Sequence, residues 1–461
     1  MALDIVIMAA GKGTRMKSSL PKVLHKLAGR SLLQHVLHTA AQLQADRIIT
    51  ITGHGAESVE TAVKAPQLQF VRQEPQLGTG HAVQQAVPSL HDAGTTLILN
   101  GDVPLITERT ARALVEACGG QKLALLTIDL ADPTGYGRIV RQGQGDTSTV
   151  LAIVEHKDAT ARQREIREVY TGMMAVPTAA LKRWLANLKN DNAQGEYYLT
   201  DIVAMAVADG TPVVAAQPLT EAEVLGVNSP SQLADLERRH QRAQAEQLMT
   251  DGVRLADPTR FDLRGELRCG TDVEIDINCI FEGMVHIGNG TRIGAHCVIR
   301  NARIGDNVVI HPYTHIDGDK DGASVGAGSL IGPFARLRPG AQLAEEVHIG
   351  NFVEVKNSTL AKGAKANHLA YLGDATVGER VNYGAGSITA NYDGANKHRT
   401  VIGNDVHVGS NCVLVAPVTL GDGATVGGGS TISKPVPAGE LAVARGKQVN
   451  LSGWARPQKK R

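Results

Sequence analysis

The C-terminal half of the chain repeats apolar residues with a period of six. A small residue often follows the aliphatic one, as Gly332 follows Ile331. The repeated positions are Ile287, Ile293, Ile299, Val325, Ile331, Leu337, Leu343, Ile349, Val355, Ile402, Val408, Leu414, Leu420, Val426 and Ile432. In a parallel β-helix each short strand points one branched side chain inward, and a small residue lets the chain turn the corner. The pattern therefore predicts a left-handed parallel β-helix of hexapeptide repeats.

The N-terminal half has another pattern, in which short apolar runs alternate with helical spacing. The segment Ser31–Leu43 places apolar residues at helical intervals, behind a serine suited to cap the helix. The predicted strands are Asp4–Met8, Arg47–Ile51, Leu68–Val71, Thr96–Asn100, Lys122–Ile128, Val150–Val154 and Gly172–Val176. This alternation predicts a Rossmann-like α/β domain with a mostly parallel sheet, whose ligands bind beyond the carboxyl ends of the strands.

The change of pattern also predicts the domain boundaries. Ser229 and Pro230 begin a polar, helix-favouring segment that runs through Met249. We therefore predict an α/β domain at residues 1–228, a connecting helix at 229–250 and the β-helix at 251–461. The hexad register breaks at 317–324 and at 389–401, where we expect loops on the flank of the coils.

Composition narrows the choice of partners and compartment. Glycine supplies 50 of 461 residues and aromatics only 3%, which favours tight turns and small cores. Lys and Arg total 47 against 46 Asp and Glu, so the net charge gives no reason to expect nucleic acid as a partner. The five cysteines contain no CxxC pair, which argues against a disulfide framework or a zinc site. The apolar run Leu3–Ala10 is too short to span a membrane and lacks a basic leader, so we expect a cytoplasmic protein.

A glycine-rich loop, Met8–Met16, directly follows the first predicted strand. Its small residues let backbone N–H groups approach an anion, and Lys12 and Arg15 add positive charge, which suits the phosphates of a nucleotide. The loop is neither a Walker motif nor a complete dinucleotide fingerprint. An ordinary tight turn remains the alternative.

Three later features strengthen the nucleotide hypothesis. A buried-looking strand ends in Asp102, where a carboxylate can hold Mg²⁺ between protein and phosphate oxygens. Lys22 offers a second cation, while Gln73 and the turn Leu77–Gly80 can contact a base edge. A helix-capping aspartate and a solvated lysine are the alternatives for Asp102 and Lys22.

Polar residues also interrupt the hexads, where a purely structural ladder does not need them. They are Arg338, Lys356, His368, Tyr371, Asn382, Asn391, Tyr392 and Arg445. Two cations suit a sugar phosphate, and a neutral histidine can accept a proton from an amine that attacks a thioester. Most of the 16 histidines are expected to be ordinary surface residues, and His368 is distinguished by its setting in Ala366–Asp374.

Longer motifs in both halves resemble a known family. They are Leu-Pro-Lys-Val-Leu-His (20–25), Gln-Leu-Gly-Thr-Gly-His-Ala (76–82), Gly-Asp-Val-Pro-Leu (101–105), Asp-Pro-Thr-Gly-Tyr-Gly-Arg-Ile (132–139), Glu-His-Lys-Asp-Ala (155–159), Gln-Gly-Glu-Tyr-Tyr-Leu-Thr-Asp (194–201), Gly-Pro-Phe-Ala-Arg-Leu-Arg-Pro-Gly (332–340) and Asn-Tyr-Asp-Gly (391–394). Together they resemble the bacterial bifunctional enzymes that combine glucosamine-1-phosphate acetyltransferase and N-acetylglucosamine-1-phosphate uridylyltransferase activities. The resemblance covers essentially the whole chain and implies synthesis of UDP-N-acetylglucosamine, a precursor of peptidoglycan and lipopolysaccharide.

The resemblance implies roles for residues of the N-terminal half. Residues implied to bind UTP and the sugar phosphate are Met8, Ala9, Ala10, Gly11, Arg15, Lys22, Gln73, Gly78, Thr79, Asn100, Gly101, Asp102, Gly137, Glu155, Tyr170 and Asn228. Among them, Asp102 and Asn228 carry Mg²⁺, and Gly137, Glu155 and Tyr170 contact the acetylated sugar.

It implies a second site in the coils, with His368 as the general base. Arg338 and Lys356 then hold the phosphate, while Tyr371 and Asn382 hold the sugar. Residues implied to line acetyl-CoA are Ala385, Asn391, Tyr392, Ser410, Gly428 and Arg445. Family members are trimers with acetyl sites between neighbouring β-helices, so the resemblance also implies a homotrimer.

Four positions depart from the family pattern. Met8 stands in place of Leu, Asn100 replaces an aromatic residue, and Gly428 stands in place of Ala. Tyr170 replaces an Asn that contacts the sugar, which puts that hydrogen bond in question. Two other functions remain open. One is a nucleotidyltransferase with a structural β-helix, and the other is a non-catalytic regulatory subunit built from the same two folds.

Overall fold

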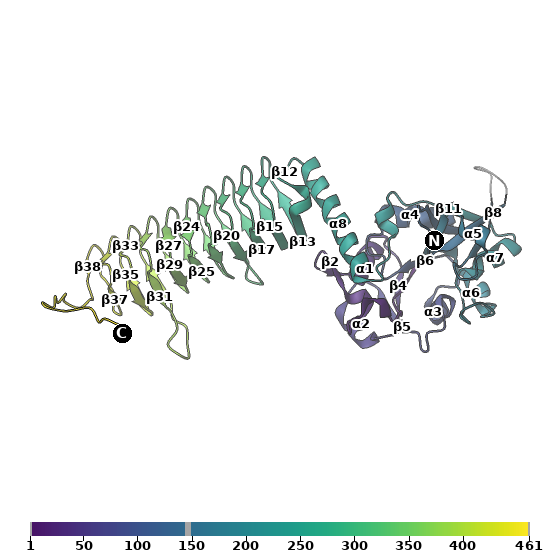
Figure 1. The fold of residues 1–461 in the computed structure, drawn as a ribbon, viewed down its shortest axis with the longest axis horizontal. Coiled ribbons are helices and arrows are strands. Elements are labelled where there is room, and N and C mark those ends of the chain that lie inside the picture. Colours follow the sequence, from purple (N-terminus) through teal and green to yellow (C-terminus); the bar gives the residue numbers. More distant parts are fainter. Residues whose placement is uncertain (1, 143–148, 460–461) are drawn as a thin grey trace. The chain divides into compact units, whose positions relative to one another are not determined.

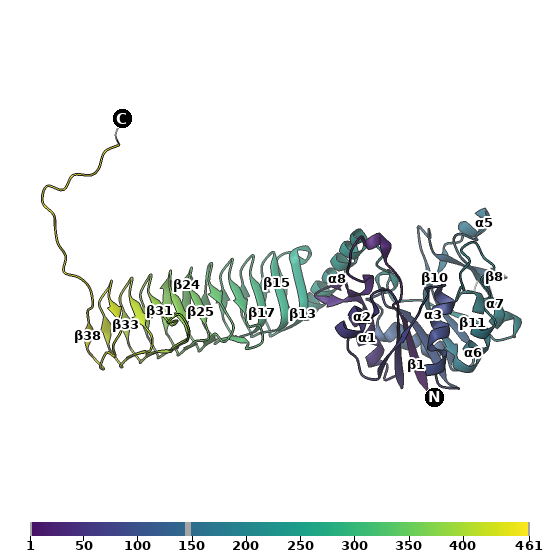
Figure 2. The ribbon, with the colours of Figure 1, turned by 90° about the horizontal axis from the view of Figure 1, so that it is seen from below.

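The computed structural model describes residues 2–142 and 149–459 and divides into two compact units, 1–240 and 241–461. The division falls within helix α8 (Pro230–Thr250), where the sequence predicts a helix. No helix within the described residues combines the length and apolar character needed to cross a membrane. Figures 1 and 2 show the elements of each unit.

The N-terminal unit is an α/β domain around a nine-stranded sheet in the order β11-β7-β10-β6-β1-β4-β5, with β8 and β9 attached beside β10. Its strands are β1 (Leu3–Met8), β4 (Arg47–Thr52), β5 (Leu68–Arg72), β6 (Thr95–Asn100), β7 (Leu123–Asp129), β8 (Gly137–Gln142), β9 (Thr149–Val154), β10 (Glu168–Pro177) and β11 (Val213–Ala216). β10 runs antiparallel to β6 and β7, while β1 is parallel to β4 and β6. The predicted mostly parallel sheet is confirmed, although β8 and β11 were missed.

Helices cover both faces of this sheet, which explains the nearly continuous apolar runs of its central strands. The helices are α1 (Leu32–Gln42), α2 (Ala56–Ala62), α3 (Thr79–Ala86), α4 (Glu108–Cys118), α5 (Ala161–Arg164), α6 (Thr178–Ala186) and α7 (Asp201–Ala208). One core packs α1 and α4 on the sheet, and the other packs α3, α6 and α7. Ser31 caps α1 as predicted, because its hydroxyl accepts from Gln34 N. Single 3₁₀ turns span Thr14–Met16, Lys22–Leu24, Val87–Ser89 and Glu221–Val224, and β2 (Lys26–Leu27) pairs with β3 (Arg30–Ser31).

The C-terminal unit is a solenoid of parallel strands in two ladders, the second of which divides after β17 into one row through β19 and another row through β20. The first is β12 (Arg254–Leu255), β14 (Glu274–Ile275), β16 (Arg292–Ile293), β18 (Val309–Ile310), β21 (Leu330–Ile331), β24 (His348–Asn351), β27 (Lys365–His368), β30 (Asn382–Tyr383), β33 (His407–Val408), β36 (Thr425–Val426) and β38 (Leu441–Ala442). The second is β13 (Phe261–Cys269), β15 (Cys279–Ile287), β17 (Val298–Ile304), β19 (His315–Asp317), β20 (Ala323–Val325), β22 (Arg336–Leu337), β23 (Gln342–Leu343), β25 (Glu354–Lys356), β26 (Thr359–Leu360), β28 (Tyr371–Gly373), β29 (Ala375–Val377), β31 (Ile388–Ala390), β32 (Thr400–Ile402), β34 (Val413–Val415), β35 (Val418–Leu420) and β37 (Thr431–Ile432). A 3₁₀ turn, Pro258–Arg260, precedes β13.

The hexad residues form one apolar core along this solenoid. Ile293, Ile331 and Ile349 stack in register on β16, β21 and β24, and each is buried. The predicted β-helix is therefore confirmed, and its coils begin with β12, before the first regular hexad. The expected loops follow β19 and β31. The second of them, residues 391–399, leaves the coils as a hairpin in which Tyr392 bridges Lys397.

An exposed row of aromatic rings stacks along one corner of the coils. The rings of His296, Tyr313, Phe334 and Phe352 lie 4.8, 5.0 and 5.3 Å apart, and we call this row the aromatic ladder. Each ring belongs to a residue with positive φ, a conformation that aims its side chain outward at the turn. Leu369 continues the row on the next coil, since its N–H donates to the Asn351 carbonyl. The ladder thus runs up to the neighbour of His368.

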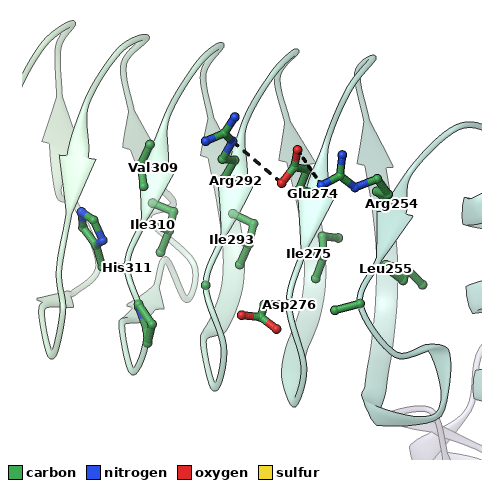
Figure 3. Close-up of a pocket in the computed structure, with 13 residues that line it drawn as sticks. Arg254, Leu255, Glu274, Ile275, Asp276, Arg292, Ile293, Val309, Ile310 and His311 are labelled. Carbon is green, nitrogen blue, oxygen red and sulfur yellow. Dashed lines mark ion pairs between the residues drawn. The ribbon is translucent and has the colours of Figure 1, made fainter.

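The first coils also carry a surface cavity of about 410 Å³ (Figure 3). Glu274 lies between Arg254 and Arg292, at 3.0 Å and 3.8 Å, and links three successive strands of the first ladder. Exposed ion pairs of this kind each contribute about 1 kcal/mol or less. The cavity contains none of the predicted site residues, so we assign it to the packing of the coils.

Candidate active sites

A cavity of about 460 Å³ opens at the carboxyl ends of β1 and β6, where the sequence predicts a nucleotide. The predicted residues that line it are Met8, Ala9, Ala10, Gly11, Lys22, Gln73, Gly78, Thr79, Asn100 and Asp102. Most of them come from the glycine-rich loop, from the turn after β5 and from the end of β6, while Lys22 comes from the 3₁₀ turn Lys22–Leu24. Lys12, Gln76 and Glu196 complete the polar lining.

Glycine is required at Gly78, which precedes α3. Its φ is 107°, and an added Cβ would lie 2.6 Å from the carbonyl oxygen of Tyr197. Gln73 is only 3% exposed, and its Nε2 donates to the Gly78 carbonyl at 2.9 Å. The amide that the sequence assigned to a base edge therefore also fixes the turn that closes the cavity.

A second cavity of about 230 Å³ shares Asn100 and Asp102 with the first. Arg15 and Asn228 also line it, as do Tyr136 and Gln232, which sequence reasoning did not single out. Tyr136 belongs to the motif at 132–139, so the family resemblance contained the signal that could have identified it. Asp102 lines both cavities, so its carboxylate lies where the two cavities adjoin.

Asp102 and Asn228 converge on one cation. The Lys22 ammonium pairs with the Asp102 carboxylate and donates to Asn228 Oδ1 at 3.1 Å. Two hard oxygen donors from separate segments therefore hold a positive charge between them. Mg²⁺ typically takes one or two such protein ligands and completes its shell with water and phosphate oxygens. The donor set therefore fits Mg²⁺.

The three residues predicted to contact the sugar lie together on β8–β10. Gly137 pairs with Tyr170, and Glu155 directly follows β9. Burial raises the pKa of Glu155, opposed by a hydrogen bond from Thr200 Oγ1 at 3.0 Å. Tyr170 is 7% exposed, has no hydrogen-bond partner for its hydroxyl within the described residues, and has a pKa raised by that burial. Thr171, next to it, lines the second cavity.

In the solenoid, Arg338, Lys356 and Tyr371 lie on successive coils of the second ladder. Arg338 N donates to the Val355 carbonyl, and β25 pairs with β28. Lys397, which the sequence analysis missed, reaches this group from loop 391–399. Its proximity, followed by burial, lowers the pKa of Lys356 below the usual value. Three cations therefore converge, an arrangement that suits a phosphate.

Buried hydrogen bonds stabilise the segments that carry these three cations. Asp374 is buried with positive φ, and its two carboxylate oxygens accept from the amides of Asn357 and Asn391. Glu354 Oε1 accepts from Arg338 at 2.8 Å. Asn391, predicted to line acetyl-CoA, thus also anchors the start of the loop that carries Lys397. None of these side-chain contacts could be read from the hexad pattern.

His368 lies at the exposed corner that ends β27. Its Nδ1 lies 3.0 Å from Asn351 Oδ1 on the preceding coil. Asn382 is on the following coil, where its amide lies 3.1 Å from His407 Nδ1. The imidazole therefore lies at an exposed corner, between the coil of Asn351 and the coil that begins with Asn382.

The residues predicted to line acetyl-CoA divide into a column and a loop. Ala385, Ser410 and Gly428 follow strands β30, β33 and β36 at the same position in successive coils. Arg445 donates to the Gly428 carbonyl at 2.6 Å. Tyr392 lies apart in loop 391–399, where its hydroxyl donates to the Gly394 carbonyl at 2.6 Å.

Comparisons with known proteins agree with both halves of this description. Residues 5–249 match the MobA-like NTP transferase domain, 399–434 match the bacterial transferase hexapeptide (six repeats), and 284–311 match the hexapeptide repeat of succinyl-transferase. The chain is 78% identical to Bifunctional protein GlmU of Methylibium petroleiphilum, with all of both chains covered. It is 69% identical to the protein of the same name from Paracidovorax citrulli and 57% identical to that from Cupriavidus pinatubonensis, with 99% of each chain covered.

Proposed function

The chain belongs to the GlmU family of bifunctional enzymes, and from this premise we propose which reactions its two sites perform. The C-terminal site transfers the acetyl group of acetyl-CoA to glucosamine 1-phosphate. The N-terminal site then transfers a uridylyl group from UTP to N-acetylglucosamine 1-phosphate and releases pyrophosphate. The observation that carries the proposal is that each unit gathers its own set of anion-binding residues.

In the N-terminal unit, the loop after β1 and the cations Arg15 and Lys22 bind the phosphates. A phosphate oxygen of the sugar attacks the α-phosphorus of UTP as the bond to pyrophosphate breaks. Such a reaction depends on alignment and charge neutralisation more than on covalent help from the protein. Asp102 and Asn228 would hold Mg²⁺, which supplies positive charge to the phosphate oxygens when bound.

In the C-terminal unit, Arg338, Lys356 and Lys397 hold the phosphate of glucosamine 1-phosphate. His368 accepts a proton from the amine as its nitrogen bonds to the thioester carbonyl carbon. The carbon–sulfur bond then breaks, and the proton passes to the sulfur of CoA. Ala385, Ser410 and Gly428 form the column against which acetyl-CoA lies.

The same proposal includes the predicted sugar contacts, the functions of the segments and the cellular compartment. Gly137, Glu155 and Tyr170 bind the sugar in the uridylyl site. The functional segments are 1–228 for uridylyl transfer, 229–250 as the connecting helix and 251–461 for acetyl transfer. The enzyme acts in the cytoplasm, where acetyl-CoA and UTP are available.

We also propose that the enzyme is a homotrimer joined through its β-helices. The support is the aromatic ladder with Leu369, because Tyr313, Phe334, Phe352 and Leu369 are 47% to 61% exposed and form a continuous apolar row. Light scattering should give a trimer for the protein and monomers for the double variant Phe334→Ser, Phe352→Ser. Leu219→Ser, on an exposed residue of the other unit, is the control. A trimeric double variant or a monomeric parent would contradict the proposal.

The two reactions are tested on the purified full chain. We expect CoA release with acetyl-CoA and glucosamine 1-phosphate, and Mg²⁺-dependent pyrophosphate release with UTP and N-acetylglucosamine 1-phosphate. A single-function nucleotidyltransferase would release only pyrophosphate, and a regulatory subunit would release neither product. The Asp102–Lys22 contact and the three cations on the coils disfavour both alternatives.

A further inference from the structure

His368 has one side-chain partner within the described residues, and that partner is Asn351. The two residues occupy neighbouring coils, where β24 and β27 pair Asn351 directly with His368. The 3.0 Å contact joins the amide oxygen to Nδ1, which leaves Nε2 on the opposite edge of the ring. Because both residues end their strands at the same corner, the stacked backbones fix this geometry.

A neutral imidazole carries its proton on one nitrogen, and the hydrogen bond of that nitrogen determines which one. An acceptor beside Nδ1 holds the proton there and leaves Nε2 with a free lone pair. Only this tautomer can take a proton from an amine through Nε2. With Nδ1 unpartnered, the two tautomers compete and the ring can rotate away from the substrate.

The hydrogen-bond partner of His368 is an uncharged amide. Its oxygen can therefore orient the ring without placing a negative charge beside it. Titratable groups on the strands that meet this corner are His348, Glu354, Lys356, Lys365, Tyr371, Tyr383 and, through Asn382, His407. No ion pair or hydrogen bond joins any of them to the imidazole within the described part of the chain. The amide of Asn351 is therefore the side chain placed to control the tautomer of His368.

We propose that Asn351 is a positioning residue for acetyl transfer. Its Oδ1 accepts the Nδ1–H of His368 and keeps Nε2 unprotonated toward the amine of the acceptor. This inference rests on the proposed function, in which His368 is the base. As the carbon–nitrogen bond forms, the amine proton moves to Nε2. The ring then gives that proton to the departing sulfur, and the Nδ1–H bond to Asn351 stays intact throughout.

The test compares Asn351→Ala, which removes the acceptor, with Asn351→Asp, which keeps an acceptor of the same shape. We expect Asn351→Ala to lower kcat for acetyl transfer about tenfold to a hundredfold, with KM for glucosamine 1-phosphate within about twofold of the parent. Asn351→Asp should restore at least about a third of kcat. Its carboxylate should also move the acidic limb of the kcat/KM profile to higher pH, because it stabilises the imidazolium.

One further readout and one control variant separate this role from a structural one. Uridylyl transfer in the same preparations reports on folding, and should not change. Asn278→Ala is the control, because the Asn278 amide also lies beside a histidine of the next coil, at 3.5 Å from His296 Nε2, far from this site. If the alanine variant does not fold, Asn351→Ser and Asn351→Asp provide the same comparison.

Two results would overturn the inference. One is a kcat for Asn351→Ala close to that of the parent, and the other is an Asn351→Asp variant as slow as the alanine variant with an unmoved acidic limb. The proposed function fails in a different way, since it requires His368→Ala to lose acetyl transfer. An inactive His368→Ala with a fully active Asn351→Ala rejects only the role of Asn351.

Discussion

The two sites gather their residues in opposite ways. The N-terminal site joins segments far apart in the chain, as when Lys22 meets Asn228 through the topology of an α/β sheet. The C-terminal site stacks residues one coil apart, as when Asn351 meets His368 across 17 positions. In the coils, contacting residues lie one coil apart in the sequence, whereas in the sheet they come from distant segments. Because each site takes its residues from one unit, mutations in one site should leave the other site's activity unchanged.

The largest expected effect is a loss of acetyl transfer at the C-terminal site. His368→Ala should lower the rate of CoA release by about 10²- to 10⁴-fold, the usual contribution of a general base, and leave pyrophosphate release unchanged. Both products are measured in one preparation. Loss of both activities together would contradict the model of two independent sites, and His315→Ala on β19 serves as the control histidine.

Asp102→Ala should give the reverse result. Removing the carboxylate between the two cavities should lower Mg²⁺-dependent pyrophosphate release about a hundredfold or more and spare CoA release. The exposed Asp92→Ala controls for loss of a surface charge. Undiminished pyrophosphate release over a magnesium titration would refute the assignment of the metal site.

Two glycine-to-alanine substitutions compare the backbone packing of the two sites. Gly78→Ala puts a Cβ 2.6 Å from Tyr197 O at a positive φ, so strain of about 2 kcal/mol should slow uridylyl transfer more than about tenfold. Gly428→Ala places its Cβ 3.4 Å from Ser410 O, an ordinary contact. Its KM for acetyl-CoA should stay within about twofold. Equal losses in the two variants would show that this difference in packing has no functional consequence.

Lys397 tests whether loop 391–399 belongs to the acetyl site. Lys397→Met should raise KM for glucosamine 1-phosphate about tenfold, because one charge-assisted contact is worth about 1.5 kcal/mol. The effect should shrink as salt is added, since the contact is ionic. Lys362→Met, whose ammonium pairs with Glu345 and Glu346, should leave KM unchanged. A normal KM for Lys397→Met would remove this loop from the phosphate site.

The smallest expected effect is a pH-dependent change in the thermal stability of the N-terminal unit. Burial raises the pKa of Glu155 above its ordinary 4.5, so the folded state loses stability as pH rises through that range. Glu155→Gln should therefore raise the Tm of the N-terminal unit by about 1–3 °C at pH 7.5 and have little effect at pH 4. Glu57→Gln, on an exposed carboxylate of α2, should change neither value. An equal shift at both pH values would exclude ionisation as the cause.

The local sequence pattern determined much of the fold and part of the N-terminal site. The six-residue rhythm predicts the buried row Ile293, Ile331 and Ile349, because each coil must bury one branched side chain whatever else it does. The loop after β1 and the carboxylate after β6 were likewise predictable, since parallel strands present such residues at one edge. The family resemblance added Asn228, Ala385, Ser410 and Gly428, which the pattern alone did not single out.

The tertiary structure decided which side chains meet. Strands of neighbouring coils pair 18 residues apart at Arg336 and Glu354, 17 apart at Asn351 and His368, and 25 apart at Asn382 and His407. A strict period would place Gly350 beside His368, so only the observed register identifies Asn351. Lys397 reaches Lys356 because a loop folds back on the coils, a closure that no repeat encodes. The sequence alone determines what each coil buries, and the lengths of the turns between coils, visible only in the fold, determine the contacts on the surface.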